Sequence, residues 1–187
     1  MTAGTEYQIA VTSYYSYETG SVQLNWSLIQ PPVNDKFADR IAISGASGST
    51  TGTNAAATTE TGEPSYGYSS VWWAYTPSVN GTLVVDTNGS SYHLGIYTGS
   101  TVGALATVAQ AYRGISIPVT AGTEYQIAVT SYYSYETGSV QLNWDLIQPP
   151  VNDKFADRIA ISGASGSTTG TNAVSYTHLT LPTNREV

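Results

Sequence analysis

The sequence predicts an all-β protein, a jelly-roll-like antiparallel β-sandwich of about nine strands. Several short segments alternate apolar and polar residues with a period of two, which is the pattern of half-buried strands. Turn-forming pairs such as Asn80-Gly81 and Thr98-Gly99 separate these segments. No segment has the 3.6-residue apolar period of a helix that packs against a core.

The expected strands follow one another between residues 34 and 151. Seven of them are short segments that end near a turn signal, at residues 40–44, 48–57, 70–76, 81–87, 92–98, 104–110 and 114–119. Trp72 and Trp73 are adjacent in the third segment. Because adjacent strand residues point to opposite faces, we expect at least one of the two indole rings to lie in the core.

The last two strands have the clearest alternation, at residues 124–130 and 139–146. The apolar faces are Tyr125, Ile127 and Val129 in the first, and Val140, Leu142, Trp144 and Leu146 in the second. Both faces are expected to line the core, because the register of a half-buried strand is fixed by its apolar face.

A long internal repeat divides the chain. Residues 2–55 recur 118 positions later as residues 120–173, with Ser27 against Asp145 as the single difference. A period of this length corresponds to a whole domain rather than to a solenoid unit. We therefore expect one complete sandwich at residues 34–151. Residues 1–33 are expected to be the closing hairpin and linker of a preceding repeat, and residues 152–173 the beginning of a following repeat.

Each repeat ends in a connector with two adjacent prolines, at residues 30–33 and 148–151. Such a connector favours an extended and semi-rigid conformation. The hairpin at residues 5–29 duplicates the hairpin at residues 123–147, so the two compete for the same place in the complete sandwich. We expect residues 123–147 to occupy it, because a shorter loop joins them to the neighbouring strands.

The repeat stops at Ala173, and residues 174–187 differ from the matching part of the first copy. These last residues resemble an in-frame translation of the mosaic-end adaptor used in transposon-based sequencing libraries. We expect them to be an adaptor-derived scar and exclude them from the fold prediction. The chain is accordingly expected to be a fragment of a longer tandem array.

Composition excludes several classes of function. Thirteen acidic residues against six basic ones give a formal net charge of −7, so no basic surface is available to neutralise phosphates and nucleic acid is not a predicted partner. The chain has no cysteine, which excludes disulfides, thiolate metal sites and a cysteine nucleophile. No apolar run approaches the roughly 18 residues that cross a bilayer, so direct membrane insertion is not predicted.

Catalytic motifs are absent from the sequence, and we predict that the protein is not an enzyme. His93 is the only histidine before residue 174, and a lone histidine in a strand is usually a polar residue on its face. There is no nucleophile elbow, zinc-protease helix, phosphate loop or dinucleotide fingerprint. Glu60 and Glu63 are residue types that glycosidases use as acid and base, but nothing in the sequence places them in a cleft.

A series of motifs resembles a known family. Along the chain these are residues 34–38 (NDKFA), 43–49 (ISGASGS), 52–54 (GTN), 60–64 (ETGEP), 70–77 (SVWWAYTP), 86–90 (DTNGS), 96–99 (IYTG) and 121–125 (AGTEY). Their order resembles the bacterial pre-peptidase C-terminal domain. The chain departs from that pattern at residues 91–94 and 108–113, where it lacks acidic or Asn-rich positions. The resemblance implies a β-sandwich of large secreted or cell-surface bacterial proteins, often in tandem, with a non-catalytic role in secretion, display or substrate binding.

The resemblance also implies a Ca²⁺ site. Related modules bind calcium through an Asn-Asp pair at the start of the domain together with acids from a later loop. The matching residues in this chain are Asn34, Asp35, Glu60 and Glu63. Calcium takes six to eight oxygen ligands, usually including several carboxylates. The alternative is that Asn34 and Asp35 only cap a turn, which their side chains do without a metal.

A tyrosine-rich loop is the second candidate site. It contains Tyr132, Tyr133 and Tyr135, and recurs in the first copy as Tyr14, Tyr15 and Tyr17. Exposed tyrosines at a loop tip can stack on sugar rings or hold a protein partner, or else they only brace the hairpin. The first predicted function is therefore an extracellular or cell-surface spacer or display module that adjoins neighbouring repeats. The alternatives are an adhesive module that binds carbohydrate, as polysaccharide, or a surface protein, and an accessory part of a secreted hydrolase.

Overall fold

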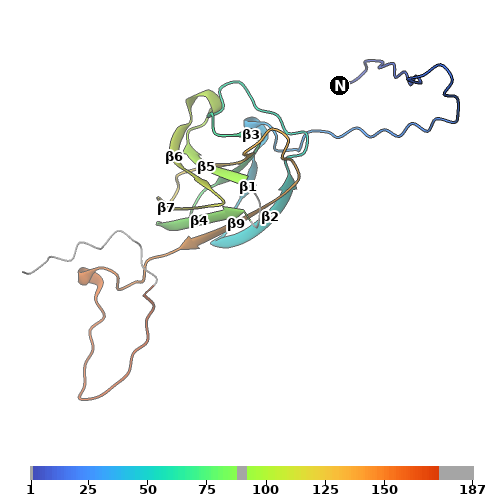
Figure 1. Cartoon of the computed structure of the whole chain (residues 1–187). Helices are drawn as coiled ribbons and strands as arrows, with labels where there is room; N and C mark the ends of the chain where they lie inside the picture. The colour runs from blue at the N-terminus through green and yellow to red at the C-terminus, as the bar shows by residue number, and fades with distance from the viewer. Residues whose placement is uncertain (1, 88–91, 173–187) are drawn as a thin grey trace, which may run out of the picture.

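The computed structural model of the protein describes residues 2–87 and 92–172, and within them it is a sandwich of two β-sheets (Figure 1). The first sheet has the strand order β1-β3-β8-β5-β6 and the second has the order β2-β9-β4-β7. The strands are β1 (Ile41–Ile43), β2 (Ser47–Thr53), β3 (Tyr68–Tyr75), β4 (Gly81–Thr87), β5 (Tyr92–Thr98), β6 (Ala106–Tyr112), β7 (Gly114–Val119), β8 (Tyr125–Ser131) and β9 (Ser139–Ile147). The predicted all-β sandwich of about nine strands is therefore confirmed.

Three short 3₁₀ turns accompany the strands: η1 (Phe37–Asp39), η2 (Val102–Ala104) and η3 (Phe155–Asp157). In the described part of the chain, no helix is long and apolar enough to span a bilayer. The strand pairs are antiparallel except for β1 and β3, which run parallel. The pair Asn88-Gly89, which the sequence predicts to form a turn like Asn80-Gly81, lies outside the described residues, and so do the predicted adaptor-derived residues 174–187.

The two closing strands belong to opposite sheets. β8 lies between β3 and β5 in one sheet, whereas β9 lies between β2 and β4 in the other. The interpretation of these strands as a paired hairpin was therefore wrong, because their apolar faces meet across the core instead of standing side by side. The loop of residues 132–138 crosses from one sheet to the other.

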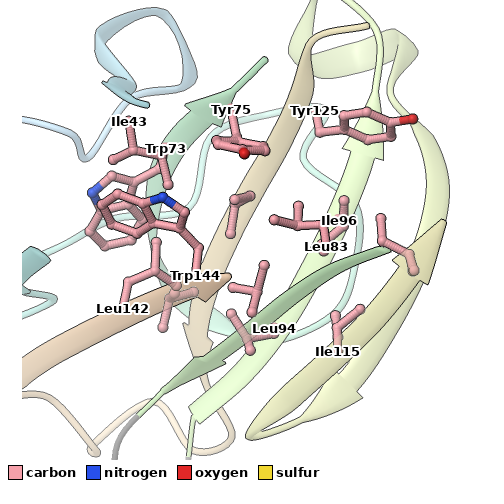
Figure 2. Close-up of a cluster of buried hydrophobic side chains, with 14 of the residues drawn as sticks. Ile43, Trp73, Tyr75, Leu83, Leu94, Ile96, Ile115, Tyr125, Leu142 and Trp144 are labelled. Carbon is pink, nitrogen blue, oxygen red and sulfur yellow. The ribbon is translucent and has the colours of Figure 1, made fainter. Parts of the chain in front are cut away.

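The core lies between the two sheets and contains the apolar faces predicted from the alternation. Figure 2 shows Leu83, Leu94 and Ile96 from the central strands with Leu142 and Trp144 from β9 in one cluster. Leu94, Ile96 and Leu142 have no exposed surface. Burial of such side chains is the main favourable contribution to folding.

A second apolar cluster covers the outer face of the first sheet. It consists of Phe37, Trp72, Tyr97 and Ala128, with Val102 and Leu105 partly buried against it. As a result every residue of β8 is buried, on both faces of the strand. Trp73 lies in the sandwich core and Trp72 in the outer cluster, so both adjacent indole rings are buried.

Several strand boundaries differ from the predicted ones by one or two residues, and the end of β2 differs by four. The strand predicted at residues 48–57 ends at Thr53, because Asn54 begins a turn in which the Ala57 amide donates to the Asn54 carbonyl (3.0 Å). Ala56 in that turn has a positive φ of 60°. The strand predicted at residues 104–110 starts at Ala106, because η2 precedes it.

The copy of the closing strands that enters the core is the one at residues 125–147, as predicted. Ile127 is fully buried and Trp144 is 9% exposed, whereas their counterparts Ile9 and Trp26 are 60% and 79% exposed. No strand is present within residues 2–33 or 152–172. The domain boundaries near residues 33 and 151 stay predictions from the repeat.

Gly48 on β2 lies directly under the Trp144 side chain, and a Cβ atom at this position would overlap the indole ring. Gly48→Ala is therefore expected to lower the free energy of unfolding by about 1–3 kcal/mol, as overpacked sites do. Gly166 is its counterpart in the last copy and has open space around it. Gly166→Ala should leave urea unfolding unchanged, and an equal loss in both variants would contradict this packing.

Candidate ligand-binding surface

The tyrosine-rich loop projects from the sandwich with its rings packed on one another. Tyr132, Tyr133 and Tyr135 are 50%, 46% and 77% exposed. The rings of Tyr132 and Tyr133 are perpendicular, with centroids 4.5 Å apart and an interplanar angle of 86°. The rings of Tyr133 and Tyr135 are stacked at 5.2 Å. Each ring thus keeps exposed area while its neighbour restricts its orientation.

The first copy of the loop has the same local arrangement. Tyr14 and Tyr15 are perpendicular at 4.7 Å, and Tyr15 and Tyr17 are stacked at 5.2 Å. In both copies a turn holds the loop, because the Glu18 amide donates to the Tyr15 carbonyl and the Glu136 amide donates to the Tyr133 carbonyl (3.1 Å each). The arrangement of the three rings is therefore set by the sequence of the loop itself.

His93 adds a second group of rings to the central copy of the loop. It projects from the outer face of β5, next to the buried Leu94. Its ring stacks on Tyr66 at 4.8 Å and is perpendicular to Tyr132 at 5.1 Å and to Tyr112 at 5.5 Å. His93 Nδ1 also lies 3.2 Å from the Tyr66 carbonyl oxygen. This histidine therefore joins the loop to β6 and to the segment before β3.

His93, Tyr66 and Tyr112 were not singled out as site residues in the sequence. The strand register brings two of them together, because His93 on β5 lies opposite Tyr112 on β6 and opposite Thr130 on β8. The alternation of β5 contained part of this information, since a core position for Leu94 places His93 on the outer face. The order of the strands in the sheet was needed for the rest.

A hollow of about 420 Å³ lies between these rings, and we call it the aromatic hollow. It is lined by His93, Tyr112, Tyr132, Tyr133 and Glu136. Among the described residues, no group hydrogen bonds to the buried Glu136 Oε2. Its counterpart Glu18 Oε2 instead accepts a hydrogen bond from the Tyr15 amide (3.4 Å). Glu136 therefore adds a carboxylate to the lining of the aromatic hollow, and one oxygen of this carboxylate is buried without a hydrogen-bond partner among the described residues.

Two phenol groups at this end of the sandwich, those of Tyr133 and Tyr92, have a raised pKa. Repulsion from the neighbouring Tyr132 is the main cause that raises the pKa of Tyr133. Burial, followed by the charge of Glu136, raises the pKa of Tyr92, which lies beneath the loop. Neutral phenols present polarised ring faces and hydroxyl groups rather than added negative charge.

Asn54 anchors the loop to the sandwich. Its side chain is fully buried, its Nδ2 donates to Ser131 Oγ (2.5 Å), and its Oδ1 accepts from the Gly138 amide (2.7 Å). Ser131 Oγ donates in turn to the Glu136 carbonyl oxygen. Both ends of the loop are thus fixed by one buried amide side chain.

The four residues predicted to bind calcium lie near one another, beside β3. Asn34 and Asp35 are buried. Asn34 Nδ2 donates to the Trp72 carbonyl (3.0 Å), and Asp35 accepts hydrogen bonds from the Thr58 amide (2.5 Å) and hydroxyl (2.9 Å). Lys36 Nζ lies 3.5 Å from Asp35 Oδ2. The Asn-Asp pair thus fixes the start of the domain to the loop that precedes β3.

The two glutamates are occupied in a similar way. Glu60 Oε2 accepts a hydrogen bond from the Phe37 amide (2.7 Å). Glu63 accepts hydrogen bonds from the Glu60 amide (3.0 Å) and from the Ser70 hydroxyl (2.6 Å). These oxygen atoms already accept hydrogen bonds from N–H and O–H donors, and a cation that binds to the same atoms would have to displace these donors. In the part of the chain that the structure describes, no group of three His, Cys, Asp or Glu residues is placed to hold a metal ion.

Calcium binding at these residues stays a prediction, which Asp35→Asn tests. From the contacts, we expect this change to lower the free energy of unfolding by about 1 kcal/mol, because the Thr58 and Lys36 interactions weaken. The loss should be the same in excess Ca²⁺ and in EDTA, measured by thermal unfolding. A calcium-dependent rise in the Tm of the wild type that Asp35→Asn abolishes would establish the calcium site instead.

No protein-family profile and no curated protein matches the sequence. Similar solved structures include Aeromonas hydrophila PliG, a periplasmic lysozyme inhibitor of g-type lysozyme, with 14% identity and a TM-score of 0.42 over 57% of this chain and 95% of that chain. Salmonella Typhimurium PliG, an inhibitor of the same class, has 10% identity and a TM-score of 0.34 over 57% and 97%. At this level of similarity we transfer no function, partner or residue role from them.

Proposed function

We propose that the chain is a segment of a tandem array of non-catalytic β-sandwich modules in a large secreted or cell-surface bacterial protein, similar to pre-peptidase C-terminal domains. Each module acts as a spacer that displays other domains away from the cell. The observation that carries this proposal is that one complete sandwich closes on its own core, while the same connector with two prolines stands before and after it.

The path of the chain supports a spacer. The segments before and after the sandwich leave it on opposite sides (Figure 1). At the first end the chain joins the sandwich through Asn34 and Asp35, and at the other end β9 finishes at Ile147, opposite Thr82 on β4. A module with this path adds its own length to an array, and a proline connector limits folding back of one module on the next.

A protein made of two complete units, residues 34–151 in duplicate, tests the spacer. Small-angle X-ray scattering should show two separated bodies and a maximum dimension close to twice that of one unit. Replacement of Pro149 and Pro150 in the central connector with glycine should broaden the distribution of distances between the units. Side-by-side docking with dimensions that are insensitive to the connector would contradict the proposal.

The second candidate function is adhesion, and the aromatic hollow favours it. Large amphipathic rings held in fixed orientations at an exposed end are typical of binding surfaces. Repetition of such a surface along an array would raise the overall affinity through multivalent binding. Retention of the chain on insoluble polysaccharide or on a surface protein, lost when Tyr132, Tyr133 and Tyr135 become alanine, would support adhesion. The same changes at Tyr14, Tyr15 and Tyr17 are the matched control.

A further inference from the structure

We propose that the aromatic hollow binds an alkylammonium cation, a positively charged nitrogen that carries methyl or other alkyl groups. This inference rests on the second candidate function, binding at the aromatic surface, and names the chemical class of its ligand. Three features carry it: the orientations of the rings, the carboxylate in the hollow, and a cation of the chain itself that already lies over one of the rings.

The rings face in several directions around the hollow. Tyr132 is perpendicular to Tyr133 (86°) and to His93 (85°), and His93 lies at 77° to Tyr112. Rings in such orientations suit a rounded alkylammonium group, which touches several ring faces at once. A pyranose instead stacks its flat face on one open ring face, and one face of Tyr133 is covered by Tyr135.

Charge in the hollow favours a cation. Glu136 is the one acidic residue among the lining residues, and no lysine or arginine lines the hollow. Glu136 Oε2 is buried and has no hydrogen-bond partner in the described part of the chain. In the first copy, the equivalent oxygen of Glu18 accepts a hydrogen bond from the Tyr15 amide. A cation in the hollow would be attracted by the negative charge of the Glu136 carboxylate. The net charge of −7 adds long-range attraction.

A cation of the chain itself already lies over one ring of the lining, that of Tyr112. The Arg113 guanidinium carbon lies 5.0 Å from the centroid of the Tyr112 ring, within the range of cation–π attraction. The volume of about 420 Å³ is within the range of small-ligand sites. Because Tyr132 and Tyr133 form a half-exposed rim, the ammonium can be the head group of a larger molecule.

The test is titration of the whole chain with three probes, followed by NMR chemical shifts and calorimetry. The probes are choline, its neutral isostere dimethylbutanol, in which a carbon replaces the nitrogen, and a soluble cellulose oligosaccharide. We expect choline to bind at one site per chain, about fivefold more tightly than the alcohol. The affinity for choline should fall as salt concentration rises, because the attraction to Glu136 is screened.

The repeat supplies matched control variants. Glu136→Gln should weaken choline binding about two- to fivefold, and Tyr132→Ala should abolish it. Tyr132→Phe should keep it, because the ring remains, and this variant keeps the test decisive if Tyr132→Ala fails to fold. Glu18→Gln and Tyr14→Ala should change nothing, since among the described residues the first loop has no ring contact with a His93 or Tyr112 equivalent.

Each other outcome overturns the inference in a different way. Equal affinity for choline and the alcohol would show an apolar hollow without cation recognition. Binding of the oligosaccharide in place of choline would leave the adhesive function standing with a sugar as ligand. Two equivalent choline sites per chain would show that the loop alone binds and the aromatic hollow does not. If no probe binds, the alkylammonium inference fails, and adhesion is then judged by the retention experiment.

Discussion

Leu142→Ala is expected to lower the free energy of unfolding by about 2–5 kcal/mol, whereas Leu24→Ala should change it by less than about 0.5 kcal/mol. Leu142 on β9 has no exposed surface and lies in the sandwich core (Figure 2), but Leu24 is 44% exposed. The two leucines have the same neighbours in sequence, so local propensity cannot distinguish them. The difference between the two losses of unfolding free energy therefore reports which copy fills the core.

Urea unfolding of the two variants and the wild type, followed by circular dichroism, measures both values. The urea concentration at the midpoint of unfolding should fall for Leu142→Ala and stay at the wild-type value for Leu24→Ala. Similar losses in the two variants would mean that both copies enter the core in different molecules, and the assignment of β9 to residues 139–147 would then be wrong.

Asn54→Ala is expected to lower the free energy of unfolding by about 2–3 kcal/mol. Its side chain is fully buried and bonds to Ser131 Oγ and to the Gly138 amide. Without it, the part-buried Gly138 amide loses its partner and the buried Ser131 hydroxyl keeps only the Glu136 carbonyl. An unsatisfied group carries a desolvation cost of about 1–3 kcal/mol. The loop of residues 132–138 should also become more mobile, because its two ends are tied through Asn54.

Asn172 is the matched control, because it is the exposed counterpart of Asn54 in the last copy. Asn172→Ala should leave urea unfolding and the NMR spectrum of the loop unchanged. In Asn54→Ala, hydrogen exchange of the Gly138 amide should accelerate in addition to the loss of stability. A stable Asn54→Ala variant with a protected Gly138 amide would show that other contacts hold the loop.

The strands were predictable because their signal is local. Alternation along β9 identified Val140, Leu142 and Trp144 as core residues, and the turn pair Asn80-Gly81 placed the start of β4. The assignment of β8 and β9 to opposite sheets was not predictable from alternation, since either arrangement buries the same faces. The outer cluster on β8 was missed because the residues that cover it, Phe37 and Leu105, are distant in sequence.

In the candidate site, too, the local features were predictable from the sequence and the features that depend on strand register were not. The three tyrosines of the loop are visible in the sequence, and the arrangement of their rings is the same in both copies of the loop. The contribution of His93, Tyr66 and Tyr112 depends on the register of β5 with β6 and β8, which one sequence does not reveal. The family resemblance grouped Asp35 with Glu60 and Glu63, but it could not show that the Thr58 and Phe37 amides would donate hydrogen bonds to Asp35 and Glu60.

Hydrogen exchange of the whole chain, followed by mass spectrometry of its peptides, tests most directly whether one closed sandwich is the folded unit. The single difference between the copies, Ser27 against Asp145, gives peptides that contain these residues different masses. Peptides that contain Asp145 should exchange slowly, because β9 is paired on both sides, and peptides that contain Ser27 should exchange at the rate of an unprotected chain. Equal protection of the two sets of peptides would contradict the account.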